Sequence, residues 1–423
     1  MCEMKDSGIE WIGQIPKDWD VVPHKRVMHK VKKICEQYSG EDIISLTMNG
    51  VIKRDLTAGG KMPTSFDGYQ YVKPNDLLLC LFDIDVTPRC VGVVKDYGVT
   101  SPAYSRFVMH DGYYNAYYDY LLRAIDDDKV FVHLSKNLRS SLTESDFGAI
   151  KTCVPSLAEQ KRIVTFLDAQ CAEIDAVLEK TRASIEEYKK LKQAVITQAV
   201  TKGIRGDRPM KDSGIEWIGD IPAEWDVLNL VAHTSMLTPM RDRPENLDGP
   251  IPWVRIEDFE GKYIESSKAG LGVSMKTVKE MNLKVYPVGT ILCTSSCIMG
   301  KCAIVSRELV SNQRFIGIIP DRTTDKTYLY YLMTSNAERM NFLSTGALQA
   351  NLSRSAFEHL KVQFPLYSEQ QEIAAYLDDK CADIDALVAK KQQYLTEIEN
   401  YKKSLIYEYV TGKKEVKTSV LAN

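Results

Sequence analysis

A segment that occurs twice, 206 positions apart, constrains the fold of this chain more than any other feature. Residues 4–21 read MKDSGIEWIGQIPKDWDV and residues 210–227 read MKDSGIEWIGDIPAEWDV, so fifteen of eighteen positions are identical. A longer and weaker match aligns residues 120–201 with 330–411 at a constant offset of 210. Nearly the whole chain is therefore a tandem duplication, and a duplicated protein commonly faces a target that is itself two-fold or bipartite.

Each half opens with the repeated segment, continues through short strand-like runs bounded by turn residues, and ends in a long helical stretch. A chain of 423 residues exceeds the size of one comfortable core, and the repeat decides where it divides. The irregular mixture of strands and helices predicts an α+β fold in pseudo-two-fold tandem repeat. We expect globular domains at 1–156 and 207–366, a helix at 157–206, and a second helix with a tail at 367–423. Strands are expected at 76–82, 90–94, 290–294, 303–305 and 315–319, and shorter helices at 114–125 and 326–343.

The long helical stretches carry a mostly apolar 3-4 spacing over six heptads each, without Pro or Gly between 158 and 201 or between 368 and 411. Each would span roughly 65 Å at about 1.5 Å per residue. Packing of each helix on its own domain is one way to bury the seam, but so narrow a seam favours a partner helix. We predict that the two copies pair as an antiparallel coiled coil. The expected seam includes Leu167, Cys171, Ile174, Leu178 and Ile185 in the first helix and Leu377, Cys381, Ile384, Val388 and Leu395 in the second.

Two lysines, Lys192 and Lys402, interrupt this seam at equivalent positions. Their ammonium groups could reach solvent beside the seam, or they could fix the register of the pair, as buried polar residues do in coiled coils.

Composition and missing motifs argue against several classes of protein. The chain is 44% apolar and 26% charged with a net charge of −3, it has no apolar run of about 20 residues, and it begins without a secretory signal. We therefore expect a cytoplasmic protein whose scattered cysteines are free thiols. The sequence contains no GxxxxGK[ST], GxGxxG, HExxH or GxSxG motif and no amino-methyltransferase tetrapeptide. These absences predict a non-catalytic protein that binds no metal or cofactor.

Signals for nucleic-acid recognition are local. Residues 24–33, HKRVMHKVKK, carry enough positive charge to follow a phosphate backbone, although a solvated helix face explains them equally well. Polar loops with Arg, Asn and Gln recur in each half, and these side chains form paired hydrogen bonds with base edges. Ordinary surface loops contain them too. The interiors 49–106 and 253–315 hardly align, which is the pattern expected of two readers of different sequences.

With these features in view, the chain resembles the specificity subunits of type I restriction-modification systems over essentially its full length. The strongest segments are SGIEWIGQIPKDWDV, SGIEWIGDIPAEWDV, ILCTSSCIMGKCAIV, SNQRF, TGALQANLSRSAFEHLKVQFPLYSEQQEIAAYLD and YKKSLIYEYVTGK. Two weaker ones are LTESDFGAIKTCVPSLAEQKRIVTFLD and KQAVITQAVTKG. The resemblance implies that each globular domain is a target recognition domain for one half of a split DNA site, read in the major groove. It also implies that the coiled coil fixes the gap between the halves.

Partners follow from the same resemblance. Two methyltransferase subunits would bind S-adenosylmethionine and methylate an adenine in each half-site, and restriction subunits that use ATP and Mg²⁺ would join them. The residues expected to contact DNA are Lys25, Arg26, Lys30, Arg54, Lys61, Tyr104, Arg106 and Arg139 in the first half, and Trp253, Arg255, Gln313, Arg314, Gln349, Asn351 and Arg354 in the second.

Three other classes of function remain open from the sequence. A stand-alone DNA-binding regulator would need no methyltransferase, and a coiled-coil scaffold would not select a DNA sequence. A nuclease or methyltransferase would act as the isolated chain, but no motif supports it.

Overall fold

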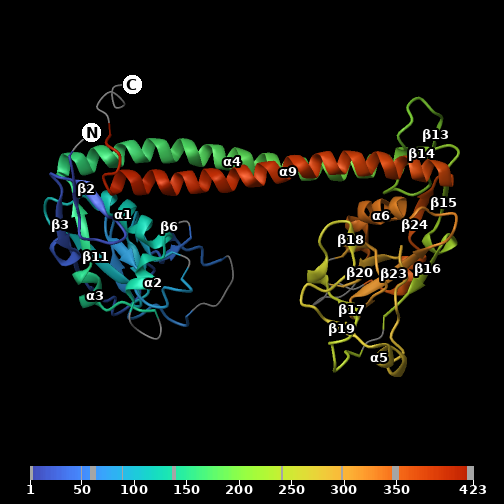
Figure 1. Ribbon diagram of the computed structural model, residues 1–423, viewed down its shortest axis with the longest axis horizontal. Coiled ribbons are helices and arrows are strands. Elements are labelled where there is room, and N and C mark those ends of the chain that lie inside the picture. Colours follow the sequence, from blue (N-terminus) through green and yellow to red (C-terminus); the bar gives the residue numbers. More distant parts are fainter. Residues whose placement is uncertain are drawn as a thin grey trace. The chain divides into compact units, whose positions relative to one another are not determined.

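The computed structural model describes residues 3–48, 50–57, 63–87, 89–135, 140–239, 242–296, 299–344 and 352–416. The chain forms two compact units (Figure 1). Unit 1 comprises Met1–Arg182 and Gln393–Asn423, and unit 2 comprises Ala183–Gln392. Each unit therefore contains one globular part together with a stretch of both long helices.

Unit 1 is built on a four-stranded antiparallel sheet whose apolar strands are buried. Its order is β4 (Met28–Lys30), β11 (Ser105–Met109), β8 (Leu77–Leu79) and β9 (Val91–Val93). Helix α1 (Asn115–Asp127) packs its apolar face on this sheet and shares a core with the long helices. The remaining elements are β1 (Met4–Asp6) with β2 (Gln14–Pro16), β3 (Asp20–Pro23) with β12 (Lys151–Val154), β5 (Ile44–Thr47) with β6 (Gly50–Lys53), β7 (Gln70–Val72) with β10 (Gly98–Thr100), η1 (His24–Arg26), α2 (Val130–Leu134) and α3 (Glu144–Ala149).

Unit 2 repeats this sheet with one additional strand. The order is β16 (Thr234–Leu237), β23 (Phe315–Pro320), β20 (Ile291–Thr294), β21 (Cys302–Val305) and β18 (Tyr263–Ile264), and only the β18–β21 pair is parallel. The other elements are β13 (Met210–Asp212) with β14 (Asp220–Pro222), β15 (Asp226–Asn229) with β24 (Lys361–Phe364), β17 (Ile251–Val254) between β19 (Gly272–Val273) and β22 (Val310–Ser311), η2 (Leu230–Ala232), η3 (Ile256–Asp258), α5 (Met275–Glu280), α6 (Lys326–Ser335), α7 (Ala337–Leu343) and α8 (Arg354–Glu358).

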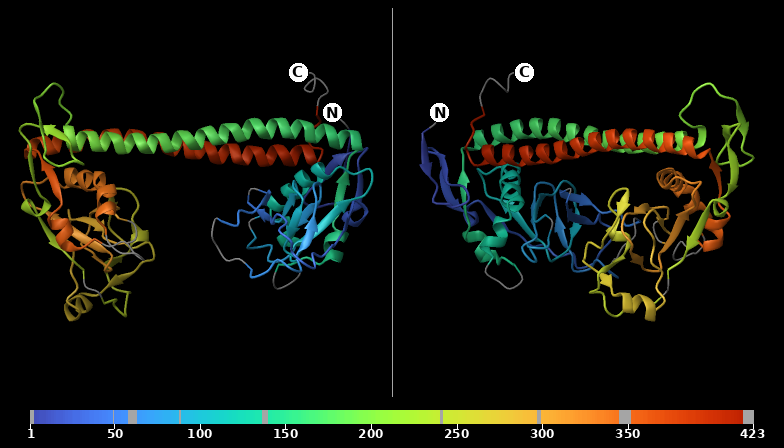
Figure 2. Two further views of the ribbon diagram at one scale, coloured as in Figure 1. Left: turned by 180° about the vertical axis from the view of Figure 1, so that it is seen from behind. Right: turned by 45° about the vertical axis from the view of Figure 1, so that its right-hand side comes forward.

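The two long helices, α4 (Leu157–Lys202) and α9 (Tyr367–Val410), run antiparallel within each unit. In unit 1 the Lys402 ammonium lies 2.6 Å from the Asp175 carboxylate, and in unit 2 Lys192 lies 2.6 Å from Asp385. Both views of Figure 2 show the paired stretches side by side. Eight of the ten expected seam residues are buried, and Ile174 and Val388 are half-buried.

Equivalent hydrogen bonds join the globular part of each unit to its long helices. The Trp19 indole N–H donates to Glu159 at 3.0 Å, and the Trp225 indole N–H donates to Glu369 at 3.0 Å. In the same way, the Tyr120 hydroxyl donates to Asp168 at 2.8 Å and the Tyr331 hydroxyl donates to Asp378 at 2.7 Å. We refer to these four bonds as the framework bonds. They show that the duplication extends to individual atoms.

The structure corrects the alignment of the two halves by one residue. Tyr120 corresponds to Tyr331, an offset of 211, whereas Asp168 and Asp378 keep the offset of 210. The two copies therefore differ by one residue between α1 and α3 in unit 1 and between α6 and α8 in unit 2. A single offset of 210 from residue 120 onward was wrong.

Most expected elements are confirmed, with two differences. The helix expected at 326–343 is interrupted at Asn336, whose side-chain amide donates to the Leu332 carbonyl at 2.8 Å. The basic stretch 24–33 is not a helix face, because η1 and β4 lie there instead. The compact units also divide both long helices, whereas the expected domain boundaries followed the helix ends.

Candidate nucleic-acid interface

A polar groove at one end of the unit 2 sheet brings together three residues expected to contact DNA. The groove encloses about 640 Å³. It lies where β16 and β20 end, where β23 begins, and where the chain enters α8. Gln313, Arg314 and Arg354 all line it. We call this surface the unit 2 groove, and its lining residues are Thr238, Pro239, Ser295, Ser296, Gln313, Arg314, Phe315, Ile316, Leu352, Ser353 and Arg354.

Main-chain hydrogen bonds fix the backbone of this groove. The Ser295 amide donates to the Arg314 carbonyl at 2.9 Å, and the Leu352 amide donates to the Ser295 carbonyl at 2.9 Å. The Ser353 hydroxyl accepts from the Ala356 amide and so caps α8. Three separate segments are thus held together, which is the rigid support that a recognition surface needs.

The charged side chains that line the unit 2 groove are exposed and give it net positive charge. Gln313, Arg314 and Arg354 are all exposed, and no acidic residue is among the described residues that line the groove. The Arg354 guanidinium lies 2.7 Å from Glu358, its neighbour along α8. A concave, positively charged, hydrogen-bonding surface suits the edges and phosphates of a nucleic acid.

In unit 1, the corresponding place has different side chains on an equivalent backbone. The Leu142 amide donates to the Leu81 carbonyl at 2.9 Å, as Leu352 donates to Ser295 in unit 2. The strand registers then place Ala103 at the position of Arg314, and Glu144 corresponds to Arg354. Positive charge in unit 1 comes instead from lysines at and after β4. Lys30 lies 3.5 Å from Glu144, and both Lys32 and Lys33 are exposed.

The other expected contact residues of unit 1 are distributed over its surface. Lys25 and Arg26 are exposed on η1, and Tyr104 is half-buried beside β11. Arg54 follows β6 and lines a separate cavity of about 470 Å³ with Lys53 and Tyr38. Lys25, Arg26 and Lys30 are therefore accessible together, and Arg54 belongs to another part of the surface.

Two expected contact residues are buried inside their units. Arg106 is only 6% exposed, and its guanidinium forms an ion pair of 2.6 Å with Asp76 and donates to the Tyr71 carbonyl at 3.1 Å. Trp253 is 5% exposed within an apolar cluster around β17. Arg255 is half-buried, with its Nε 3.0 Å from Glu257. Burial and internal bonding give Arg106 and Trp253 structural roles, so we leave both out of the interface.

Four expected residues lie outside the described parts of the chain. They are Lys61, Arg139, Gln349 and Asn351. Conversely, sequence reasoning missed Thr238, Ser295 and Ser296 as groove residues. A signal for them exists, because all three lie within two residues of the end of β16 or β20, and strand ends of one sheet gather at an edge.

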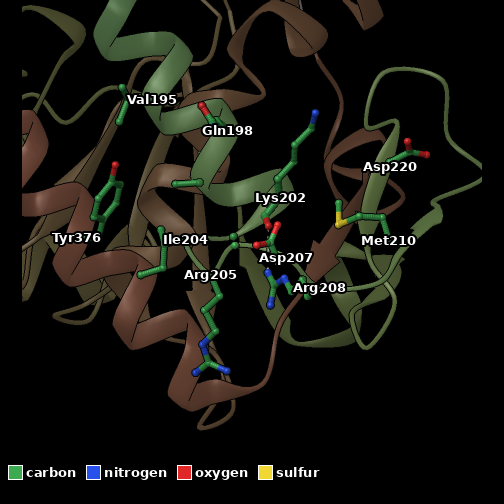
Figure 3. Close-up of a pocket in the computed structure, with 13 residues that line it drawn as sticks. Val195, Gln198, Lys202, Ile204, Arg205, Asp207, Arg208, Met210, Asp220 and Tyr376 are labelled. Carbon is green, nitrogen blue, oxygen red and sulfur yellow. Dashed lines mark hydrogen bonds between the residues drawn. The ribbon is translucent and has the colours of Figure 1, made fainter.

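Each unit has a second cavity where the repeated hairpin meets the ends of the long helices. In unit 2 it encloses about 530 Å³ between the end of α4, residues 203–208, β13–β14 and Tyr376 of α9 (Figure 3). The Arg208 guanidinium contacts Glu369 at 2.5 Å and stacks on the Trp225 ring at 5.1 Å. In unit 1 the counterpart encloses about 570 Å³, and the Lys413 ammonium there donates to the Ile12 carbonyl at 2.7 Å. We call these two surfaces the hairpin cavities.

Two further observations bound the chemistry of the described residues. They contain no group of three or more His, Cys, Asp or Glu side chains arranged to hold a metal ion. None of the helices formed by these residues is both long and apolar enough to cross a membrane.

Comparisons with known proteins identify relatives of both halves. A family model described as the type I restriction modification DNA specificity domain matches residues 226–399. The putative type I restriction enzyme MjaX specificity subunit of Methanocaldococcus jannaschii is 24% identical, and the alignment covers 96% of each chain. The MjaIX specificity subunit of the same organism is 36% identical over 173 residues, which span 38% of this chain and 40% of that protein.

Solved structures share the fold. A chain from work on the complex assembly and conformational transition of the type I R-M system superposes with a TM-score of 0.72 at 14% identity. It covers 95% of this chain and 99% of its own length. The HsdS subunit from Thermoanaerobacter tengcongensis gives a TM-score of 0.50 at 14% identity, covering 95% and 98%. At such low identity these likenesses concern the fold alone.

Proposed function

Because this chain belongs to the specificity subunits of type I restriction-modification systems, we propose that each of its units reads one half of a bipartite DNA site. The chain itself is the non-catalytic recognition subunit. The functional boundaries that we propose are recognition domains at 1–156 and 207–366, with the spacer helices at 157–206 and 367–423.

One observation carries this proposal. The two units share the framework bonds, but the side chains of the unit 2 groove differ from those at the corresponding place in unit 1. The framework bonds from Trp19 and Trp225 match atom for atom, whereas Arg314 and Arg354 in unit 2 correspond to Ala103 and Glu144 in unit 1. A single symmetric target would require like surfaces. Two different half-sites require an equivalent frame with different contacts, and this is the arrangement found.

The proposed contact residues are those that the structure leaves accessible. In unit 1 they are Lys25, Arg26, Lys30, Arg54 and Tyr104, and in unit 2 they are Arg255, Gln313, Arg314 and Arg354. Lys61, Arg139, Gln349 and Asn351 remain candidates from the sequence. Lysines and arginines of this set would neutralise phosphates, and the amide and guanidinium groups would contact base edges in the major groove.

Partner subunits would supply the chemistry and the remaining positive charge. We propose two methyltransferase subunits that bind S-adenosylmethionine and extrude an adenine from each half-site, together with restriction subunits that use ATP and Mg²⁺. With a net charge of −3, this chain gives DNA no overall electrostatic attraction. Basic partner subunits that enclose the DNA would supply the electrostatic attraction that this chain lacks. Such a complex would act in the cytoplasm.

The long helices offer surfaces for these partners. On α9, Leu387, Tyr394 and Tyr401 share one heptad position and are 42%, 48% and 57% exposed. The same position on α4 includes Val177 and Leu191, which are 39% and 48% exposed. Apolar side chains repeated outside a coiled-coil seam are what an additional helix would cover. We propose that the methyltransferase subunits dock along these helices.

Mapping of methylated adenines in genomic DNA tests the proposal directly. Cells with an intact gene should carry methylation at a two-part motif with a fixed gap, and deletion of the gene should abolish it. An unchanged pattern of methylation would contradict the proposed function. Two further readouts separate the alternatives: a stand-alone regulator would not co-purify with a methyltransferase, and a scaffold would show no sequence-selective DNA binding.

A further inference from the structure

The Arg314 guanidinium in the unit 2 groove forms no ion pair with any of the residues that the structure describes, and its availability points to the base that this unit reads. We infer that Arg314 recognises a guanine in the half-site of unit 2, and that unit 1 makes no equivalent guanine contact from the corresponding place. This inference rests on the proposed function and adds the chemistry of one base pair to it.

Arg314 has a fixed backbone and an available side chain. Its carbonyl accepts from the Ser295 amide at 2.9 Å, and its own amide donates to the Asn312 side chain at 3.2 Å. The next residue, Phe315, is buried and stacks on Phe259 with 5.1 Å between the ring centroids. The main chain of Arg314 is therefore anchored on both sides, and its exposed side chain extends from a rigid support.

Charge pairing distinguishes Arg314 from the other arginine of the groove. Arg354 is engaged by Glu358 at 2.7 Å, so part of its hydrogen-bonding capacity is used within the protein. For Arg314, the described residues provide no carboxylate within ion-pairing distance. A planar guanidinium with unused donors matches the O6 and N7 acceptors of guanine, which lie side by side in the major groove.

Its neighbours complete a polar reading surface. Gln313 is exposed beside Arg314, and an amide side chain pairs with the N6 and N7 atoms of adenine. Ser295 and Ser296 add hydroxyl-bearing residues to the lining of the groove. Hydrogen bonding to base edges, rather than charge alone, is therefore the chemistry that this groove offers.

Unit 1 presents another chemistry at the corresponding place. Leu81 and Phe82 take the positions of the two serines, and Ala103 takes that of Arg314. Phe82 is 38% exposed. Unit 1 carries exposed lysines, Lys32 and Lys33, after β4, and the Lys33 ammonium lies 5.4 Å from the centre of the Tyr71 ring. An ammonium is a point charge without the planar pair of donors of a guanidinium. The residues described at the corresponding place in unit 1 thus offer attraction to the DNA phosphate backbone and apolar contact. Paired hydrogen bonds to a base are the chemistry of the unit 2 groove.

The experiment is selection of bound sequences from a random DNA pool by the full chain assembled with its methyltransferase subunits. Wild type, Arg314→Gln and the control Arg322→Gln would be compared. Arg322 is exposed and lies two residues after the end of β23, whereas Arg314 directly precedes its first residue, so the control removes the same charge near the other end of one strand.

The wild type should select a guanine at a defined position of one half-site. Arg314→Gln should lose that preference by roughly 5- to 150-fold and shift it toward adenine at that position only, because a paired base contact is of this size. The other half-site and the gap should not change. Arg322→Gln should select the wild-type motif.

The possible failures can be told apart. If the wild type selects no sequence, the proposed function itself is wrong. If Arg314→Gln weakens binding to every sequence equally and reduces its salt dependence, Arg314 contacts a phosphate and the inference is overturned. An unchanged motif with unchanged affinity would overturn it as well. Equal melting temperatures of the three proteins would show that the variants are folded.

Discussion

At the scale of single residues, the histidine His24 of unit 1 is replaced by the leucine Leu230 at the equivalent position of unit 2. The His24 amide donates to the Ile150 carbonyl at 2.8 Å, and the Leu230 amide makes the same bond to Leu360 at 2.9 Å. His24 is fully buried and packs on Phe147 with 4.7 Å between the ring centroids. Burial lowers the pKa of His24 from 6.5 to about 4. The equivalent leucine carries no charge at any pH.

Unit 1 should therefore lose stability in mild acid because of this residue. Below about pH 6.5 the unfolded chain protonates His24, whereas the folded unit does so only near pH 4, so the stability that the neutral histidine allows is lost between these values. The difference is about 2 kcal/mol between pH 7.5 and pH 5. His24→Leu should remove it, as measured by denaturant unfolding at both pH values.

The reverse substitution in unit 2 provides the matched control. Leu230→His should introduce a new loss of stability at pH 5 that the wild type does not have at this position. Equal pH dependence of His24→Leu and wild type would show that His24 remains neutral in the unfolded chain or charged in the folded unit.

Residue roles were the part of the site least accessible from sequence. The basic and amide side chains of residues 311–315 were recognised as candidates, and Gln313 and Arg314 do line the groove. Arg106 was a candidate for the same reason, yet its strand position directs it to Asp76 in the interior. An arginine beside a strand looks alike in sequence whether its partner is a base or a buried carboxylate. Only the folded structure shows that the Asp76 carboxylate lies next to Arg106.

At the scale of elements, the lysines within the coiled-coil seam are explained by cross-helix ion pairs. Lys402–Asp175 and Lys192–Asp385 are related by the duplication, since each Asp and each Lys has its counterpart 210 positions away. All four side chains retain solvent access, so each pair contributes no more than about 1 kcal/mol. Their matched positions favour a role in fixing the register of the two helices.

Replacement of these lysines by leucine should stabilise the pair of long helices but should fix the alignment of α4 against α9 less strictly. Lys402→Leu would extend the apolar seam in unit 1, with a gain of about 1 kcal/mol that exceeds the lost pair. The melting temperature should rise by a few degrees for Lys402→Leu and for Lys192→Leu. Lys403→Leu changes an exposed neighbour by the same side-chain difference and should give no such rise. A lower melting temperature for both seam variants would mean that the ion pairs outweigh apolar packing.

The elements themselves were predicted well where local signals dominate. Both long helices begin where they were expected, at Leu157 and Tyr367, because heptads and the absence of Pro and Gly are local features, but α4 ends at Lys202, four residues before the expected end at 206. The strands at 290–294 and 315–319 were found from apolar runs, but their neighbours in the sheet were not predicted. Pairing of β17 with β22 joins residues far apart in sequence, and no local pattern encodes it.

At the scale of the whole molecule, we expect the two long helices to set the length of the gap in the proposed DNA site. Seven residues inserted after Arg182 and after Gln392 would fall between the two compact units and would preserve the heptad phase. At about 1.5 Å per residue the helical pair lengthens by roughly 10 Å, or about three base pairs. The methylated motif should keep both half-sites and gain about three unspecified base pairs.

Insertion in one helix alone serves as the control, because it cannot lengthen a matched pair. That variant should lose methylation or retain the original gap. If the double insertion also retains the original gap, the spacing is set by the partner subunits and not by this chain.

The framework bonds have a consequence for inheritance. Trp19, Tyr120, Glu159 and Asp168 all lie outside the dissimilar interior of their half, and so do their counterparts in the other half. A genetic crossover that exchanged only an interior would leave every one of these bonds intact. New combinations of half-sites can thus arise by exchange of whole segments. Such an exchange needs no compensating substitutions at the framework bonds.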